Sequence, residues 1–168
     1  MLNKIEKKYL TDLEIARLAI DIEERGYEFY TKASEKFLSD EKMRKFFDDM
    51  AKEELIHKSR FEELYNKLLD EKKGDDSLYF DIEASIYLTL LYNTSVFPSK
   101  DAVNEVLEKI NKFEDVVELA IRAEKDSIIF YDEIVKDAKF DSTKKVAITL
   151  LNEEIKHFID LSNMVKAI

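Results

Sequence analysis

The sequence predicts an all-α protein in which four long antiparallel helices form a bundle with one long crossover connection. Three observations lead to this fold class. The 168 residues include only two Gly and one Pro, and 38% of them are charged, a composition that favours helices. Apolar residues recur at helical spacing along four long segments. An internal repeat with an offset of about 100 residues links the two halves of the chain.

The first two helices are expected to form a hairpin over about residues 11–73. Thr11-Asp12 is a plausible N-cap for a helix that runs to about Phe37. Ser39-Asp40-Glu41 caps a second helix, which is expected to end near Lys73, before Gly74-Asp75-Asp76. The short loop near Leu38 makes the two helices antiparallel neighbours.

The second hairpin is expected over about residues 112–166, after a crossover of about residues 74–111. One helix begins near Lys112 and ends near Lys139, and Asp141-Ser142 starts the last helix. The crossover contains two short helical segments, about 82–92 and 101–110, separated by Pro98. Four long helices with one long crossover form the ferritin-like version of the four-helix bundle. We expect residues 1–168 to form a single domain of this type.

The two halves of the chain repeat the same polar phrases. Both histidines of the sequence lie in a Glu-Glu-x-x-His motif, at residues 53–57 and 153–157. The segment AIDIEERGYEFY (residues 19–30) also aligns with AIRAEKDSIIFY (residues 120–131), matching Ala, Ile, Glu, Phe and Tyr. Each half is therefore predicted to be a helix with a core Glu, a turn, and a helix with Glu-x-x-His. Two copies indicate a duplicated helical hairpin.

The inward-facing stripe of each long helix is apolar or small except near its middle. Charged side chains are rarely buried in a core unless they are paired or bind metal. Six charged or titratable side chains at comparable depth therefore predict a metal site, and the candidate ligands are Glu23, Glu54, His57, Glu124, Glu154 and His157.

The ligand types and their spacing predict a site for two metal ions. Residues three apart on a helix lie about 60° apart around its axis, so Glu54 and His57 can hold one ion and Glu154 and His157 a second. Four carboxylates balance the charge of two divalent cations, and each metal then has one histidine and shares carboxylates with its neighbour. This ligand set suits iron or manganese, and zinc is also possible.

Composition excludes several other functions. The net charge of −10 argues against nucleic acid or an anionic membrane as a partner. The absence of cysteine excludes disulfides, iron–sulfur clusters and thiolate-bound zinc. No apolar run near Met1 resembles a signal peptide, and the most apolar stretch, residues 82–91, is too short to cross a bilayer. We therefore expect a cytoplasmic protein.

The six candidate ligands and the flanking Ala-Ile-x-x-Glu and Phe-Tyr phrases resemble those of the rubrerythrin family of ferritin-like di-iron carboxylate proteins. The resemblance implies an iron oxidoreductase that reduces hydrogen peroxide or dioxygen. It also implies that Tyr30 and Tyr131 hydrogen-bond ligand carboxylates or donate electrons. By the same analogy, Glu53 orients His157 and Glu153 orients His57. A homodimer is the family-based expectation, formed through the apolar crossover around Ile82, Ile86 and Leu90.

Two departures from the family pattern bear on function. Without cysteines the chain has no rubredoxin-like iron centre, so the electron donor must be a separate protein or a small molecule. Ser127 stands where rubrerythrins carry an extra Glu ligand, and its repeat partner is Gly26, which either allows close packing or opens a pocket beside the metals. The remaining ligand set resembles that of bacterioferritin. The alternatives are therefore a ferroxidase or iron-storage protein, and a metal-stabilised bundle without turnover.

Overall fold

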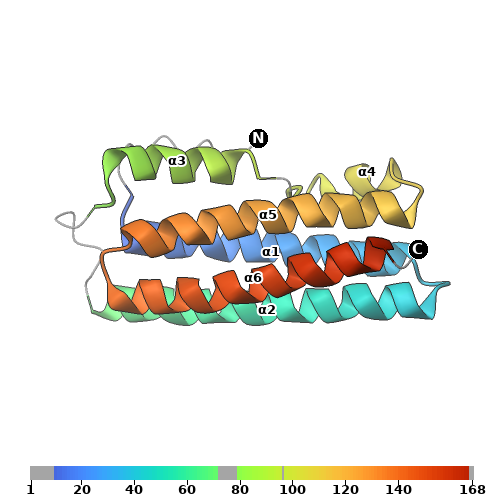
Figure 1. Cartoon of the computed structure of the whole chain (residues 1–168). Coiled ribbons are helices and arrows are strands. Elements are labelled where there is room, and N and C mark those ends of the chain that lie inside the picture. Colours follow the sequence, from blue (N-terminus) through green and yellow to red (C-terminus); the bar gives the residue numbers. More distant parts are fainter. Residues whose placement is uncertain (1–9, 72–78, 96, 167–168) are drawn as a thin grey trace.

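The computed structural model describes residues 10–71, 79–95 and 97–166 and has an all-α, ferritin-like fold (Figure 1). This part of the chain contains an isolated β-bridge between Thr11 and Tyr79, with no strand. The predicted fold class is confirmed. The helices are α1 (Asp12–Lys36), α2 (Glu41–Asp70), α3 (Ile82–Asn93), α4 (Val103–Glu108), α5 (Phe113–Asp137) and α6 (Asp141–Lys166).

The first two helices begin where the capping residues predict. Thr11 Oγ1 accepts a hydrogen bond of 3.3 Å from the backbone N–H of Glu14, whose side chain accepts one of 3.0 Å from the Thr11 N–H. This reciprocal capping box satisfies two of the N–H groups that a helix start leaves unpaired. At the start of α2, the Asp40 side chain accepts a hydrogen bond of 3.0 Å from the Met43 N–H.

Several helix ends differ from the prediction by a few residues. Helix α2 ends at Asp70 and not near Lys73; the predicted stop at Gly74 lies outside the described residues. Helix α5 ends at Asp137, because Ala138 leaves the helical conformation with ψ of 138°. Helix α4 is shorter than the predicted segment 101–110. Such boundary errors are typical when propensity alone locates a helix end.

The four long helices lie side by side, and the crossover covers only one side of them (Figure 1). Helices α1 and α2 form one hairpin and α5 and α6 the other. In the crossover, α3 packs on α5 and α4 packs on α1. Helices α2 and α6 lie next to each other on the opposite side of the bundle. The α2–α6 surface is therefore left uncovered by α3 and α4.

The core consists of two apolar clusters with a polar layer between them. One cluster includes Ile15, Leu68, Ile134 and Leu150, and the other is rich in aromatic rings. Along each long helix the predicted metal ligands fall between residues of the two clusters. The polar layer is therefore enclosed at both ends by side chains that exclude water. The aromatic members of the second cluster are Phe29, Tyr30, Phe47, Phe97 and Phe113.

Two aspartates of α1 accept hydrogen bonds from other parts of the chain. Asp12 is fully buried, and its carboxylate accepts hydrogen bonds from the backbone N–H groups of Lys139 (3.0 Å) and Phe140 (3.1 Å). The turn between α5 and α6 is thereby attached to the first hairpin. Further along α1, Tyr92 of α3 donates to Asp21 at 2.7 Å. Because a buried carboxylate is costly unless paired, the contacts of Asp12 hold the two hairpins in one arrangement. The partly exposed Asp21 adds a contact with the crossover.

The crossover helix α3 carries the most apolar stretch of the sequence but has only 12 residues. Ile86 and Leu90 on its surface are 47% and 56% exposed. The homodimer expected through this surface stays a prediction. Among the described residues, no helix combines the length and the apolar character that crossing a membrane requires.

Candidate metal centre

The six predicted ligands come together in the polar layer from all four long helices. None of the six is more than 2% exposed. Candidate ligand atoms of four of them, two glutamates and two histidines, lie within 4.8 Å of one another. The imidazole rings of His57 and His157 face each other with centroids 5.2 Å apart. The structure places the ligands as follows: Glu23 on α1, Glu54 and His57 on α2, Glu124 on α5, and Glu154 and His157 on α6.

Distances from the first histidine define one potential metal position. His57 Nδ1 lies 2.8 Å from Glu154 Oε1, 3.4 Å from Glu23 Oε2 and 3.8 Å from Glu54 Oε2. One nitrogen and three carboxylate oxygens therefore surround one point, and they come from α1, α2 and α6. This arrangement could hold one cation.

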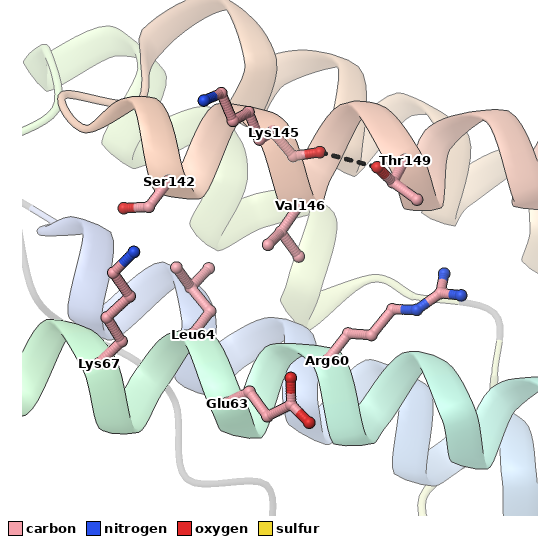
Figure 2. A pocket seen from close by; sticks show the side chains of 8 residues that line it. All are labelled: Arg60, Glu63, Leu64, Lys67, Ser142, Lys145, Val146 and Thr149. Carbon is pink, nitrogen blue, oxygen red and sulfur yellow. Dashed lines mark hydrogen bonds between the residues drawn. The ribbon is translucent and has the colours of Figure 1, made fainter.

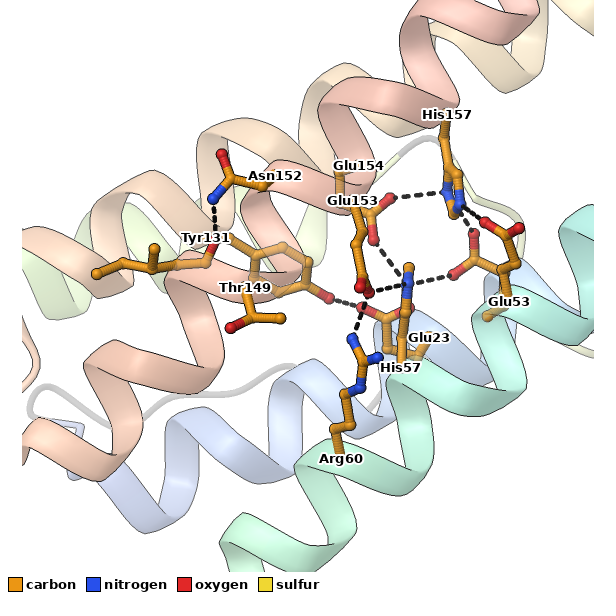
Figure 3. Close-up of polar contacts among 12 residues, drawn as sticks. Glu23, Glu53, His57, Arg60, Tyr131, Thr149, Asn152, Glu153, Glu154 and His157 are labelled. Atoms are coloured by element: carbon orange, nitrogen blue, oxygen red, sulfur yellow. Dashed lines mark hydrogen bonds and ion pairs between the residues drawn. The ribbon is translucent and has the colours of Figure 1, made fainter.

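The second histidine defines a matching position. His157 Nδ1 lies 3.4 Å from Glu154 Oε2, 3.6 Å from Glu54 Oε1 and 3.8 Å from Glu124 Oε2. The two oxygens of Glu154 thus face different histidines (Figure 3). The two oxygens of Glu54 do the same. Spacing in the sequence predicted shared carboxylates without identifying them; in the structure Glu54 and Glu154 span both positions.

Unpaired polar atoms show that this layer suits a metal. Buried polar atoms normally form hydrogen bonds, and leaving them unpaired is costly. Carboxylate oxygens and imidazole nitrogens are also the ligands that iron, manganese and zinc accept. Cations between these groups would satisfy the unpaired atoms and neutralise the carboxylates, so the residues fit a bound metal. The atoms without a hydrogen-bond partner include Glu54 Oε1, His57 Nδ1, Glu124 Oε2, Glu154 Oε1 and His157 Nδ1.

The outer edges of the two histidines contact glutamates of the opposite hairpin. His157 Nε2 lies 2.5 Å from Glu53 Oε2, and His57 Nε2 lies 2.9 Å from Glu153 Oε2 (Figure 3). Both pairs are those that the family resemblance implied. A proton on Nε2 that is donated to the glutamate leaves Nδ1 as the free acceptor. The geometry therefore directs one nitrogen of each ring toward the carboxylates of the polar layer.

Two fully buried tyrosines contact carboxylates across the hairpins. The Tyr30 hydroxyl donates to Glu124 Oε1, and the Tyr131 hydroxyl donates to Glu23 Oε1. Sequence spacing placed each tyrosine two turns from the glutamate of its own helix, whereas the hydrogen bonds join each to the glutamate of the other half. Burial, followed by the charge of the nearby carboxylates, raises the pKa of both phenols well above the usual value. Both hydroxyls therefore stay protonated donors at neutral pH.

Without a cation, the polar layer holds extra protons. Burial and the charge of Glu154 raise the pKa of Glu124 to about 8. The pKa of Glu154 is lowered, because favourable interactions with Glu124 and both histidines outweigh the effect of its burial. Burial disfavours a charged imidazole, yet the nearby carboxylates of Glu154 and Glu23 raise the pKa of His57 to about 11. Metal binding must therefore release protons from this layer.

Gly26 provides the space that the Glu54 side chain occupies. A Cβ atom at residue 26 would lie 3.2 Å from both Cδ and Oε2 of Glu54. Contacts this short require the neighbouring side chain to shift. The sequence left open whether Gly26 permits close packing or opens a pocket, and this contact supports close packing. Its repeat partner, Ser127, is buried on α5.

Arg60 is the residue near the site that the sequence interpretation missed. Its guanidinium Nη1 donates to Glu153 Oε2, the same oxygen that faces His57 Nε2 (Figure 3). The repeat offers one signal that could have found it. With the offset of 100, Arg60 aligns with Asp160, so the two halves differ in charge one turn beyond their histidines.

Fold and site together define a class of protein: a ferritin-like helical bundle with a buried glutamate and histidine group that could bind metal. Within this class the assignment is specific, because the Rubrerythrin family model matches residues 14–165. The chain belongs to the rubrerythrin family, and the resemblance inferred from the sequence is confirmed. The chain contains no cysteine and thus no rubredoxin-type metal site. No curated protein and no solved structure matches it significantly.

Proposed function

We propose that this protein is a dinuclear iron oxidoreductase that reduces hydrogen peroxide or dioxygen with electrons from an external donor. The observation that carries the proposal is the pair of buried Nδ1 atoms, which face the carboxylates of Glu54 and Glu154 without forming a well-aligned hydrogen bond. Membership of the rubrerythrin family supports iron as the metal. The charge of four carboxylates supports two divalent ions.

Each ligand has a distinct role in holding such a pair. Glu23 and Glu124 each serve one position, beside His57 and His157 respectively. Glu54 and Glu154 each direct one oxygen toward either position and would hold both ions. When bound, two ferrous ions supply two electrons, which with two protons reduce one hydrogen peroxide to two water molecules.

The surrounding residues orient the ligands and control protons. The Tyr30 and Tyr131 hydroxyls hold a proton against Glu124 and Glu23, which limits how far these carboxylates can turn. The apolar clusters on both sides of the layer limit access of bulk water. After each turnover, two electrons must return from a separate carrier protein or a small reductant, because the chain lacks a cysteine-bound iron centre of its own.

Stopped-flow oxidation tests the proposed reaction. Protein loaded anaerobically with two equivalents of ferrous iron is mixed with hydrogen peroxide or with dioxygen, and the ferric absorbance is followed. We expect at least one oxidant to oxidise the bound iron faster than the same concentration of free ferrous iron. The Glu154→Ala variant, which lacks one spanning carboxylate, should lose this advantage. Oxidation no faster than that of free iron with either oxidant contradicts the enzyme function.

Ser127 favours a second candidate, a protein that oxidises ferrous iron in order to handle or store it. With Ser127 in place of an additional glutamate, the ligand set resembles that of bacterioferritin. Storage requires a large shell of many subunits, so size-exclusion chromatography separates the candidates. A dimer supports the oxidoreductase, and a cage of many subunits supports storage. Zinc in protein purified under iron-replete conditions would instead support a metal-stabilised bundle without turnover.

A further inference from the structure

The outer contacts of the two histidines differ in charge. Glu153, the partner of His57, also accepts a hydrogen bond from Arg60 and is 26% exposed. Glu53, the partner of His157, is 56% exposed and has no basic partner within the described residues. Asp160, the repeat partner of Arg60, lines the same groove as Glu53. One histidine is therefore linked to a carboxylate that is paired with an arginine, and the other to a carboxylate without such a partner.

Both contacts lie in the groove between α2 and α6, the side that the crossover leaves uncovered. Arg60 stands at the junction of two parts of this groove. One part contains the outer edges of both histidines. The other continues toward the start of α6, where Leu64 and Lys67 of α2 face Ser142 and Val146 of α6 (Figure 2). Arg60 thus brings positive charge to the half of the polar layer that contains His57.

The strength of a histidine ligand depends on its outer contact. A carboxylate that accepts the Nε2 proton makes Nδ1 a better electron donor to a metal. Arg60 donates to the very oxygen that faces His57, so it competes for that oxygen and reduces its negative charge. A fixed cation near a metal position also repels a second cation. Both effects weaken metal binding on the same side.

We propose that Arg60 makes the two metal positions unequal: the position formed by His57 and Glu23 binds a divalent cation more weakly than the one formed by His157 and Glu124. The proposal rests on the dinuclear centre proposed above. Arg60 acts through Glu153 and His57 and is a positioning residue. One position then fills first, although duplication has given both the same ligands.

The groove offers a matched control for charge. Lys156 also lines the part of the groove that contains the histidines, and it forms no salt bridge with any described residue. Its repeat partner, Ile56, lines the same stretch. Removing the charge of Lys156 therefore changes the net charge of the groove by the same amount as removing that of Arg60, but leaves the Glu153 contact intact.

Titration of the metal-free protein with Co²⁺ tests the proposal, with calorimetry for the affinities and visible absorption for the ligand geometry. We expect two binding steps. Arg60→Gln should raise the affinity of the weaker position by about tenfold, which is the lower end of the effects seen when a residue behind a metal ligand is replaced. Arg60→Lys keeps the charge, so its two affinities should stay close to those of the natural protein. Asp160→Arg should lower the tighter affinity. Lys156→Gln should leave both steps nearly unchanged.

The outcomes separate this proposal from the proposed function. If Arg60→Gln binds two ions with unchanged affinities, or binds the ion at the weaker position less tightly, the proposed role of Arg60 is wrong, but the dinuclear centre stands. An equal effect of Lys156→Gln would show that only net charge matters and would also overturn it. Fewer than two bound ions in the natural protein would contradict the dinuclear centre itself. Melting curves of the metal-free variants verify that each of them folds.

Discussion

The two hairpins repeat one pattern, yet neither contains a complete half of the site. Glu53 of the first hairpin contacts His157 of the second, and Glu153 of the second contacts His57 of the first. The tyrosine contacts cross between the hairpins in the same way. Each hairpin therefore orients the ligands of the other. Duplication here has produced two interlocked copies, and the site depends on their association.

The two hairpins differ at two pairs of equivalent positions close to the metal ligands. Gly26 in the first corresponds to Ser127 in the second, and Gly26 lies against a spanning carboxylate, Glu54. Arg60 corresponds to Asp160, with opposite charge. The ligands and their direct hydrogen-bond partners are thus repeated, whereas the residues at these two pairs of positions differ. The differences between the hairpins can be tested separately from the features they share.

Metal removal should have the largest effect on stability. Four buried carboxylates from both hairpins meet at this layer, and without a cation their charges are not neutralised. One site with free metal at 100 times its Kd stabilises the native state by about 2.7 kcal/mol. For two sites in a chain of this size, chelation should lower the Tm by roughly 10–20 °C. Calorimetry with and without chelator measures the shift. An unchanged Tm would mean that the carboxylates do not share a buried metal.

The effect of chelation should depend on pH. The folded pKa of Glu124 is raised to about 8 and that of His57 to about 11, so both groups bind protons more tightly in the folded metal-free protein than in the unfolded chain. The stabilisation that these protons give the folded state is complete at a pH below the unfolded-state pKa. It is lost as the pH rises through the folded-state pKa. Metal binding instead requires deprotonated ligands. The Tm difference should therefore be larger at pH 8 than at pH 6.

The sequence predicted the fold and the ligand types because both follow from local patterns. Helical periodicity identified Glu23 and Glu124 as charged residues on apolar stripes, and the repeat supported Glu54 and Glu154 as their partners. Which carboxylate oxygen faces which histidine depends on the rotation of the helices about their axes, which periodicity leaves free by tens of degrees. Helix ends such as Asp70 depend on backbone conformations that propensity does not determine.

Arg60 could not be recognised for a related reason. A single half-buried basic residue on a helix has no periodic signal, and its importance arises only from the position of Glu153 on another helix. Gly26 was noticed in the sequence, but its role depends on the side chain that packs against it. Contacts between hairpins are long-range in sequence, so they become visible only when the bundle is assembled.

The crossed tyrosine contacts predict equal effects in the two halves. Tyr30→Phe and Tyr131→Phe each remove a buried donor to a buried glutamate oxygen. Each variant should lose about 1–3 kcal/mol of unfolding free energy, because a buried acceptor is left without its partner. Urea denaturation of the metal-free proteins measures both values. A difference well above about 1 kcal/mol between the variants would show that the two contacts are not equivalent.

Gly26→Ala should have the smallest effect on stability. It tests the difference between Gly26 in the first hairpin and Ser127 in the second. Replacing a helical Gly by Ala favours the helix by about 1 kcal/mol, whereas the new Cβ, 3.2 Å from the Glu54 carboxylate, must displace that side chain by a few tenths of an ångström. Since Glu54 spans both metal positions, we expect an apo Tm that is unchanged or slightly higher and a Co²⁺ affinity that falls by about three- to tenfold.

The reciprocal change in the second hairpin supplies the control. Ser127→Gly removes a Cβ that this hairpin already accommodates, so it should cost about 0.5–1 kcal/mol of helix stability and leave metal affinity unchanged. Opposite responses of stability and affinity in the two variants would show that Gly26 is kept for the space that Glu54 needs. If Gly26→Ala binds two Co²⁺ ions with the affinity of the natural protein, Glu54 has room to move, and the glycine reflects only helix packing.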